Sequence, residues 1–233
     1  PDDKNYRKCT NKDEMYEFIN SIPLAYKTGS DLQYSDFGFI VLGKIIEHYK
    51  GNLEEYANEV IFKPLEMTHT MFNPKEKGFV DLCVTEEIQE DRGGAIIGEA
   101  HDGKAFRMGG VSGNAGLFST VEDISRFVQM LLRDGENVLS PASINLLKTY
   151  RTENKPSIRT LGWIANDNDA SDGDYYSSKC LYHTGFTGTS IYVDFERGCG
   201  IVLLINAVHP HRGNPYTMSI RNRVHNVILS EYR

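Results

Sequence analysis

The sequence has no long hydrophobic run, little cysteine and no excess of positive charge, and each absence excludes a class of protein. The longest apolar run, residues 201–205, is far shorter than the ~20 residues that a membrane-spanning helix needs. With 25 Lys and Arg against 32 Asp and Glu, the net charge of −7 gives no reason to expect a nucleic-acid partner. A small-molecule or peptide ligand is the default expectation.

Cysteine is scarce, and none of the four cysteines belongs to a Cys-x-x-Cys pair of the kind that binds zinc. We expect four mostly buried thiols, with one disulfide as the open alternative; the residues are Cys9, Cys83, Cys180 and Cys199. No other segment predicts a metal or an organic cofactor. His209-Pro210-His211 has no carboxylate or thiol beside it, so an exposed loop is the better interpretation.

An initiating methionine is also absent, because the sequence opens with Pro1. We therefore expect that the native N-terminus is missing. The lack of a signal peptide then says little about location, and the cell envelope, secretion and the cytoplasm all stay open.

The composition that is present, 40% hydrophobic and 24% charged, is ordinary for a globular protein of one large or two small domains. Apolar spacing and capping residues predict mainly helices in the first part. The expected helices cover 13–21, 36–49, 53–62 and 121–133, with one opening at Ser140-Pro141 and one closing the chain at 217–232. Gly51 is the expected end of the second helix, and Ser119-Thr120-Val121-Glu122 has capping-box spacing. The closing helix has an apolar face of Ile220, Val224, Val227 and Ile228.

The later part of the chain predicts short antiparallel strands at 160–164, 189–194 and 200–206, with a hairpin turn at 196–200. The glycine-rich stretch 93–116 predicts a shaped loop. The fold class is therefore α+β, with a mostly helical part at 1–150 and a sheet part with a closing helix at 151–233. Since natural sheets usually have ~4–6 strands, the three or four visible here suggest that part of the sheet is missing.

Tyr34-Ser35-Asp36 stands at the start of the helix predicted at 36–49. The positive end of a helix dipole favours phenolate, so Tyr34 could act as a general base if a cation lies nearby. The alternative, more probable for this segment alone, is that Asp36 caps the helix and Tyr34 packs on the core.

His183-Thr184-Gly185 lies on a predicted strand, where a glycine lets a ligand backbone approach the strand edge. His183 could donate a hydrogen bond or relay a proton near neutral pH. A strand-end histidine followed by a glycine bulge is the alternative. His101-Asp102 is a weaker pair, because adjacent residues rarely orient each other, and we expect a structural turn there.

Five segments, taken together and in order, resemble class C β-lactamases and the related D,D-peptidases and esterases. The resemblance covers nearly the whole chain, and its specificity comes from the joint order of short motifs. The segments are Tyr34–Glu47, Ile61–Met67, Gly109–Thr120, Leu161-Gly162-Trp163, and His183-Thr184-Gly185 with the strands that follow it.

The resemblance implies a β-lactamase/D,D-peptidase-like fold, with a helical lobe and an antiparallel sheet flanked by helices. It also implies a serine hydrolase that works through an acyl-enzyme on a β-lactam, a D-Ala-D-Ala-like peptide or an ester. Tyr34 would be the base or proton relay. Asp36, His183, Thr184 and Gly185 would contact substrate, and the Phe186 N–H would form half of the oxyanion hole.

The sequence departs from the family pattern at three points. Asp36 stands where an asparagine is usual, and His183 stands where lysine is common; both changes favour an esterase or peptidase over a true β-lactamase. The nucleophile motif Ser-x-x-Lys occurs nowhere in the 233 residues. We therefore expect a fragment that is inactive alone, with a non-catalytic β-lactam or peptidoglycan-peptide sensor as the alternative.

Overall fold

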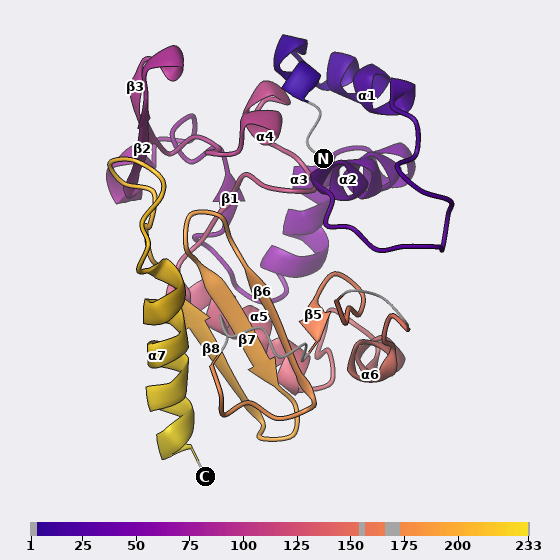
Figure 1. Ribbon diagram of the computed structural model, residues 1–233, viewed down its shortest axis with the longest axis vertical. Helices are drawn as coiled ribbons and strands as arrows, with labels where there is room; N and C mark the ends of the chain where they lie inside the picture. The colour runs from indigo at the N-terminus through magenta and orange to yellow at the C-terminus, as the bar shows by residue number, and fades with distance from the viewer. Residues whose placement is uncertain (1–3, 154–156, 166–172, 233) are drawn as a thin grey trace. The chain divides into compact units, whose positions relative to one another are not determined.

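The computed structural model describes residues 4–153, 157–165 and 173–232, so Pro1 lies outside the described residues. Backbone contacts divide the chain into two compact units, which are described separately (Figure 1). The first comprises Pro1–Lys63 and Thr68–Ser119, and the second Pro64–Met67 and Thr120–Arg233. The boundary that we expect at residue 150, between a mostly helical part and a sheet part, is a different division and stays a prediction.

Helices form the core of the first unit. The principal ones are α1 (Lys12–Ser21) and α2 (Asp36–Lys50), which confirm the predicted helices at 13–21 and 36–49. The helix predicted at 53–62 is α3 (Leu53–Ala57), continued by a wider π-helical turn (Asn58–Phe62). Short helical turns cover Lys4–Lys8, Val80–Leu82 and Glu90–Arg92. The apolar centre of this unit contains Cys9, Met15, Ile40 and Met108.

Two small antiparallel sheets complete the first unit. Strand β1 (Met71–Phe72) pairs with β4 (Leu117–Phe118), and β2 (Thr85–Gln89) pairs with β3 (Gly94–Ile97). The sequence did not predict these strands, because runs this short and partly polar show no alternation. The glycine-rich stretch 93–116, expected as a loop, also contains the short helix α4 (Gly103–Arg107).

Two glycines let the glycine-rich stretch lie against α2. A Cβ on Gly43 of α2 would come 3.2 Å from the Gly113 Cα, and a Cβ on Gly113 would come 2.1 Å from the Phe39 carbonyl oxygen. Both neighbours are backbone and cannot rotate away. The close contact therefore needs a residue without a side chain at Gly113.

The second unit is built on a four-stranded antiparallel sheet of order β5-β6-β7-β8. Its strands are β5 (Ile164–Ala165), β6 (Cys180–Thr184), β7 (Ser190–Asp194) and β8 (Cys199–Leu203). The strand predicted at 189–194 is confirmed as β7, and the hairpin turn predicted after it is confirmed as well. The predicted strand 200–206 continues past β8, because apolar residues follow the last ladder pair. The predicted strand 160–164 shares only Ile164 with β5, because residues 161–163 form a bend, across which the Thr160 N–H donates to the Trp163 carbonyl.

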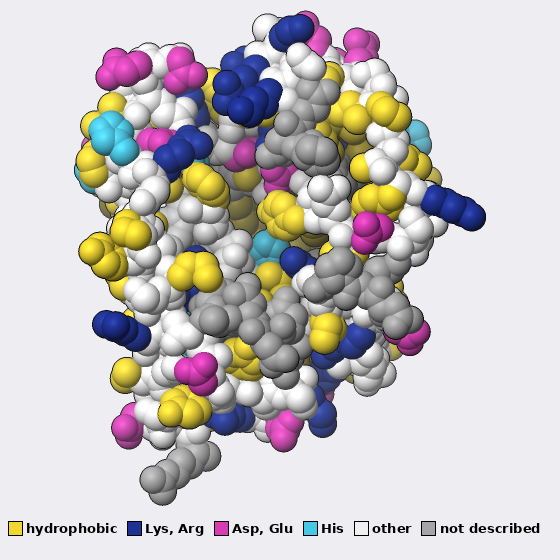
Figure 2. Space-filling model, in the orientation of Figure 1, with side chains coloured by type: hydrophobic (Ala, Val, Ile, Leu, Met, Phe, Trp, Pro, Cys, Tyr) yellow, Lys and Arg dark blue, Asp and Glu magenta, His cyan; other side chains and the backbone are white. Residues whose placement is uncertain are grey.

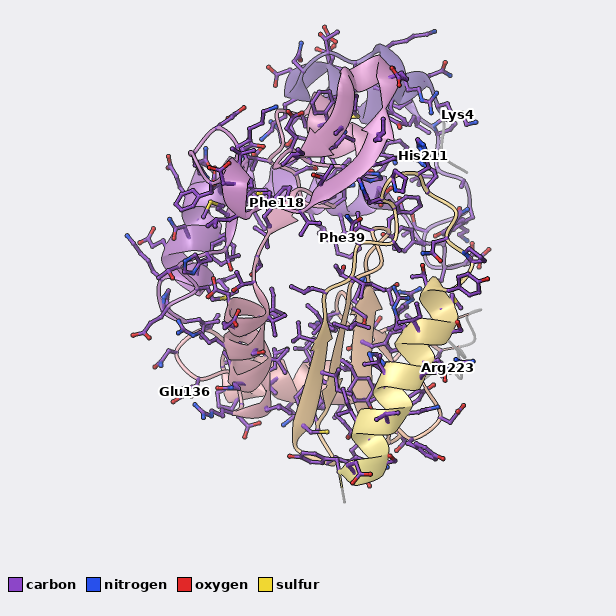
Figure 3. All side chains as sticks on the ribbon, turned by 90° about the vertical axis from the view of Figure 1, so that its left-hand side faces the viewer. Lys4, Phe39, Phe118, Glu136, His211 and Arg223 are labelled. Carbon is purple, nitrogen blue, oxygen red and sulfur yellow. The ribbon has the colours of Figure 1, made fainter. Side chains whose placement is uncertain are left out.

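Helices cover both faces of this sheet, with α5 (Val121–Leu132) on one side and α7 (Thr217–Glu231) on the other (Figures 1 and 3). The side chains of the central strands alternate accordingly. Leu181 and Val193 join a cluster with α5 and with α6 (Pro141–Thr149), whereas Tyr182 and Tyr192 join a cluster with Leu229 of α7.

The N-caps of α5 and α6 differ in how well the sequence predicted them. Ser140 caps α6 directly before Pro141, as expected, and its Oγ accepts a hydrogen bond from the Ser143 N–H. Thr120 caps α5, and its hydroxyl accepts from the Asp123 N–H. The capping-box assignment to Ser119 was therefore one residue too early.

The predicted packing face of α7 is wrong. The sequence favoured an apolar face of Ile220, Val224, Val227 and Ile228, but the buried residues are Arg221, His225 and Leu229. The Arg221 guanidinium donates to backbone carbonyls of the β6–β7 turn, and His225 Nε2 lies 3.4 Å from Ser190 Oγ of β7. These polar contacts, and not the apolar stripe, orient the helix.

The remaining general expectations concern cysteines, membrane spans and surface charge. All four cysteines are free thiols, and three of them are buried, which confirms the first of the two alternatives. No helix in the described residues has the length and apolarity to cross a bilayer. Charged side chains of both signs are scattered over the face that Figure 2 shows.

Candidate active site

One group of predicted site residues lies in the first unit, at the N-terminus of α2. Tyr34 is 62% exposed and belongs to the extended segment 31–35 that leads into the helix. Ser35 is the N-cap, and its Oγ accepts a hydrogen bond from the Gly38 N–H at 3.1 Å. The alternative in which Asp36 caps the helix and Tyr34 packs on the core is wrong, because the capping oxygen comes from the preceding residue and Tyr34 faces solvent.

Asp36 is instead paired with a lysine that the sequence did not predict. The Lys104 Nζ donates to Asp36 Oδ2 at 2.9 Å, and Lys104 is only 4% exposed. Its ammonium also lies 3.8 Å from Asp102 Oδ2. A lysine 68 residues away in a glycine-rich stretch carries no sequence signal of such a pairing.

Hydrogen bonds within the glycine-rich stretch hold Lys104 in place. Asp102 Oδ1 accepts from the backbone N–H groups of Lys104 and Ala105, at 3.0 and 2.8 Å, and so caps α4. The same oxygen accepts from Asn114 Nδ2 at 3.1 Å, and Ser112 Oγ in turn donates to Asn114 Oδ1 at 2.7 Å. This network ties the start of α4 to the following loop.

His101 and Asp102 do not orient each other as a base and its carboxylate. His101 Nε2 contacts Glu87 Oε2 at 2.9 Å, while Asp102 is engaged in capping α4. The structural interpretation of this pair is confirmed. Among the described ranges there is also no group of three or more His, Cys, Asp and Glu residues that could hold a metal ion.

The other group of predicted site residues lies in the second unit, at the end of β6. His183 pairs with Ile191 of β7 in the ladder, and its Nδ1 lies 3.0 Å from the Thr184 carbonyl oxygen. Because a carbonyl only accepts, Nδ1 carries the hydrogen in this contact. Burial lowers the pKa of His183, the bond to Thr184 opposes this, and the charge of Arg159 lowers the pKa further; the net direction is downward. His183 is therefore neutral at physiological pH.

A tight turn follows the His-Thr-Gly segment. The Gly185 N–H donates to the Thr189 carbonyl at 2.8 Å, and the Gly188 N–H donates to the Gly185 carbonyl at 3.0 Å. Gly188 has φ +112°, and a Cβ there would come 2.8 Å from Ile205 Cγ1. The turn leaves the Phe186 ring 70% exposed, with the Arg212 guanidinium 5.4 Å from the ring centroid.

Arg221 of α7 supports this turn by donating hydrogen bonds to its backbone. Its Nη2 donates to the Gly188 carbonyl at 2.9 Å and to the Thr189 carbonyl at 3.3 Å, and the residue is buried. The sequence did not predict this role, because α7 was expected to pack through its apolar residues and not through an arginine near its N-terminal end. The structure thus brings His183, Thr184, Gly185 and Phe186 together at one supported strand end.

The two groups of residues differ in chemical capacity. The group at α2 offers an exposed phenol and a carboxylate neutralised by a buried ammonium. The group at β6 offers a strand end, a neutral imidazole and a turn supported by Arg221. An exposed phenol suits proton transfer, and a strand end followed by a glycine turn suits pairing with an extended substrate.

Comparison with known proteins decides the family. The family model described as Beta-lactamase matches residues 1–222. The chain belongs to the beta-lactamase family. This confirms the resemblance expected from the five ordered segments. Among solved structures, a β-lactamase from Mycobacterium bovis aligns with 92% of this chain and 69% of its own, at a TM-score of 0.68 and 19% identity. The α+β fold expected for the family is therefore confirmed.

Curated relatives of this beta-lactamase family chain are bacterial. An N-acetylmuramyl-L-alanine amidase of Bacillus subtilis (strain 168) is 37% identical, over 85% of this chain and 49% of the relative. A putative D-alanyl-D-alanine carboxypeptidase of Escherichia coli O157:H7 is also 37% identical, over 88% of this chain and 51% of the relative. The chain thus spans about half the length of the curated relatives it matches.

Proposed function

We propose that the full-length protein carrying this chain is a serine hydrolase that cleaves an amide bond of a peptidoglycan peptide through an acyl-enzyme. The observation that carries the proposal is that a chain of this family has both an exposed Tyr34 at a helix start in the first unit and a His183-Thr184-Gly185 strand end in the second unit. The names of the two relatives described above, an amidase and a carboxypeptidase, support amide cleavage.

The proposed nucleophile is a serine of a Ser-x-x-Lys motif outside these 233 residues, since no such motif occurs within them. Its hydroxyl adds to the substrate carbonyl, and Tyr34, as phenolate, accepts the hydroxyl proton. Tyr34 then returns this proton to the amine nitrogen as the C–N bond breaks, which leaves the acyl group on the serine as an ester. The carbonyl oxygen takes up negative charge in this step, and the Phe186 N–H is proposed to stabilise it. Water then hydrolyses the ester, which releases the acid and restores the serine.

Substrate binding is proposed for the strand end and for Asp36. Thr184 and His183 would bind the substrate carboxylate, and Gly185 would let the substrate backbone approach the strand edge. A neutral His183 offers a hydrogen bond without a full charge, so a carboxylate is held less tightly than by a lysine. This favours a peptidase or amidase over a β-lactamase with high turnover of penicillins.

The test is covalent labelling of the full-length protein with a fluorophosphonate and with a fluorescent penicillin, followed by mass-spectrometric mapping. The expected result is one labelled serine in a Ser-x-x-Lys motif, slower labelling of Tyr34→Phe, and no labelling of the 233-residue chain alone. Tyr49→Phe, an exposed tyrosine at the far end of α2, serves as the matched control. Reversible penicillin binding without a labelled serine would instead support a sensor and overturn the hydrolase proposal.

A further inference from the structure

We propose that Lys104 is a positioning residue that neutralises Asp36 and thereby lets the site accept an anionic substrate. The inference rests on the proposed function and deepens it, because it concerns the charge of the substrate. From the sequence alone, an aspartate in place of the usual asparagine disfavours anionic substrates. In the structure, however, the positive charge of Lys104 lies beside Asp36 and balances its negative charge.

The contact between the two residues is short and shielded from water. Lys104 Nζ lies 2.9 Å from Asp36 Oδ2, and the lysine is almost wholly buried. The rings of Tyr6 and Phe37 flank the ammonium, with their centroids at 4.9 and 5.9 Å. A buried ammonium requires a counter-charge, so Asp36 and Lys104 stabilise each other in the ionised state.

Among the described residues, the carboxylate of Asp102 also lies near this ammonium, but its Oδ2 is farther away, at 3.8 Å. Its Oδ1 accepts three hydrogen bonds from the Lys104 and Ala105 N–H groups and from Asn114. Much of the charge of Asp102 is therefore stabilised by local donors. Of these two carboxylates, Asp36 depends more on Lys104.

The burial of Lys104 also decides how it acts. At 4% exposure its ammonium does not reach a substrate, so it works through Asp36, which remains partly exposed at the first turn of α2. Without Lys104, Asp36 would present a bare carboxylate. Two like charges ~10 Å apart, at an effective dielectric constant of ~20, repel each other enough to weaken binding roughly tenfold, and an effect of this size is expected.

The experiment is a double-mutant cycle in the full-length protein: wild type, Lys104→Met, Asp36→Asn and the double variant. For each protein, kcat/KM is measured for diacetyl-L-Lys-D-Ala-D-Ala, which carries a carboxylate, and for neutral p-nitrophenyl acetate. The ratio of the two values cancels general damage to the site. Binding of benzylpenicillin by calorimetry gives a second readout that needs no turnover.

Lys104→Met is expected to lower the anionic-to-neutral ratio about tenfold, and the added Asp36→Asn is expected to restore it. A purely structural lysine would predict a loss for both substrates that Asp36→Asn does not repair. Lys12→Met is the matched control, because it breaks the 2.7 Å ion pair with Glu47 near the other end of α2, and it should leave the ratio unchanged.

Three outcomes decide the matter. An equal fall for both substrates in Lys104→Met, unrepaired by the second substitution, overturns the role of Lys104. If wild type turns over neither substrate but penicillin binding follows the expected order of variants, the hydrolase proposal fails and the role of Lys104 stands. If neither turnover nor variant-dependent binding is seen, both proposals fail.

Discussion

Asp194 at the end of β7 is the residue whose replacement should cost the second unit most. It is fully buried, and its carboxylate accepts hydrogen bonds from three backbone N–H groups and two hydroxyls. The donors are Ser177 N and Oγ, Tyr192 OH, Glu196 N and Arg197 N, at 2.6–3.1 Å. The carboxylate thus closes the β7–β8 hairpin and fixes the segment that enters β6.

The two carboxylate oxygens allow the magnitude to be worked out. Asp194→Ala leaves all three N–H groups without their acceptor; at ~1–3 kcal/mol each, reduced by partial rehydration, the expected loss is roughly 3–5 kcal/mol. Asp194→Asn keeps an oxygen at the Oδ1 position, which accepts from Ser177 Oγ, Glu196 N and Arg197 N. It turns an amide donor toward Ser177 N, so the expected loss is about 1–3 kcal/mol.

The assay is urea unfolding followed by the fluorescence of Trp163, the one tryptophan of the chain, which packs on the core of the second unit. Both variants should lower the midpoint with an unchanged m-value. Burial by itself raises the pKa of Asp194, but hydrogen bonds from Ser177, Arg197 and Tyr192 outweigh it and hold the pKa below the ordinary 3.8. The stabilisation is therefore present above pH ~3.8 and lost as pH falls further.

The reasoning would be refuted in two ways. Asp194→Ala could unfold within about 1 kcal/mol of wild type, which would mean that water replaces the carboxylate at little cost. Alternatively, wild type and Asp194→Asn could lose stability equally below pH ~3.8. The asparagine cannot titrate, so its stability profile should be the flatter one in that range.

Two further predictions concern backbone support of the candidate site. Gly113→Ala places a Cβ 2.1 Å from the Phe39 carbonyl oxygen and should lower the free energy of unfolding by about 3 kcal/mol in urea titrations. Gly38→Ala is the control, because a Cβ at this position of α2 would have its nearest contacts at 3.7 Å, and it should be neutral or stabilising. Equal losses of stability in the two variants would contradict the argument. Arg221→Met should speed amide hydrogen exchange in the β6–β7 turn at least tenfold, because two carbonyls of the turn lose their donor. Exposed Arg223→Met on the same helix (Figure 3) should not, and equal exchange in both variants would exclude this support.

Much of the fold could be predicted because local signals and tertiary packing agree. Gly51 ends α2, and Ser140-Pro141 marks the start of α6, as expected from capping preferences. The strand that carries His183 and the hairpin after β7 also follow from local composition. In these segments the preferred local conformation is the one the unit requires.

The remaining features depend on contacts between distant residues. The face of α7 was predicted wrongly because Arg221 and His225 gain polar partners on the sheet side, a gain that hydrophobic periodicity does not register. Lys104 was missed for a similar reason, since its partner Asp36 lies 68 residues earlier. A sequence pattern can predict which residues suit a site, but the charge balance around them follows from the fold.

The short segment Pro64–Met67 has a consequence for how the chain can be divided. It belongs to the second unit, and its Leu65 packs against the core cluster of α5, α6 and the sheet, although the residues before and after it belong to the first unit. No single cut therefore yields two complete pieces. Cleavage between Ser119 and Thr120 would remove Leu65 from the core that it completes. A piece that starts at Thr120 therefore lacks one side chain of the core of the second unit.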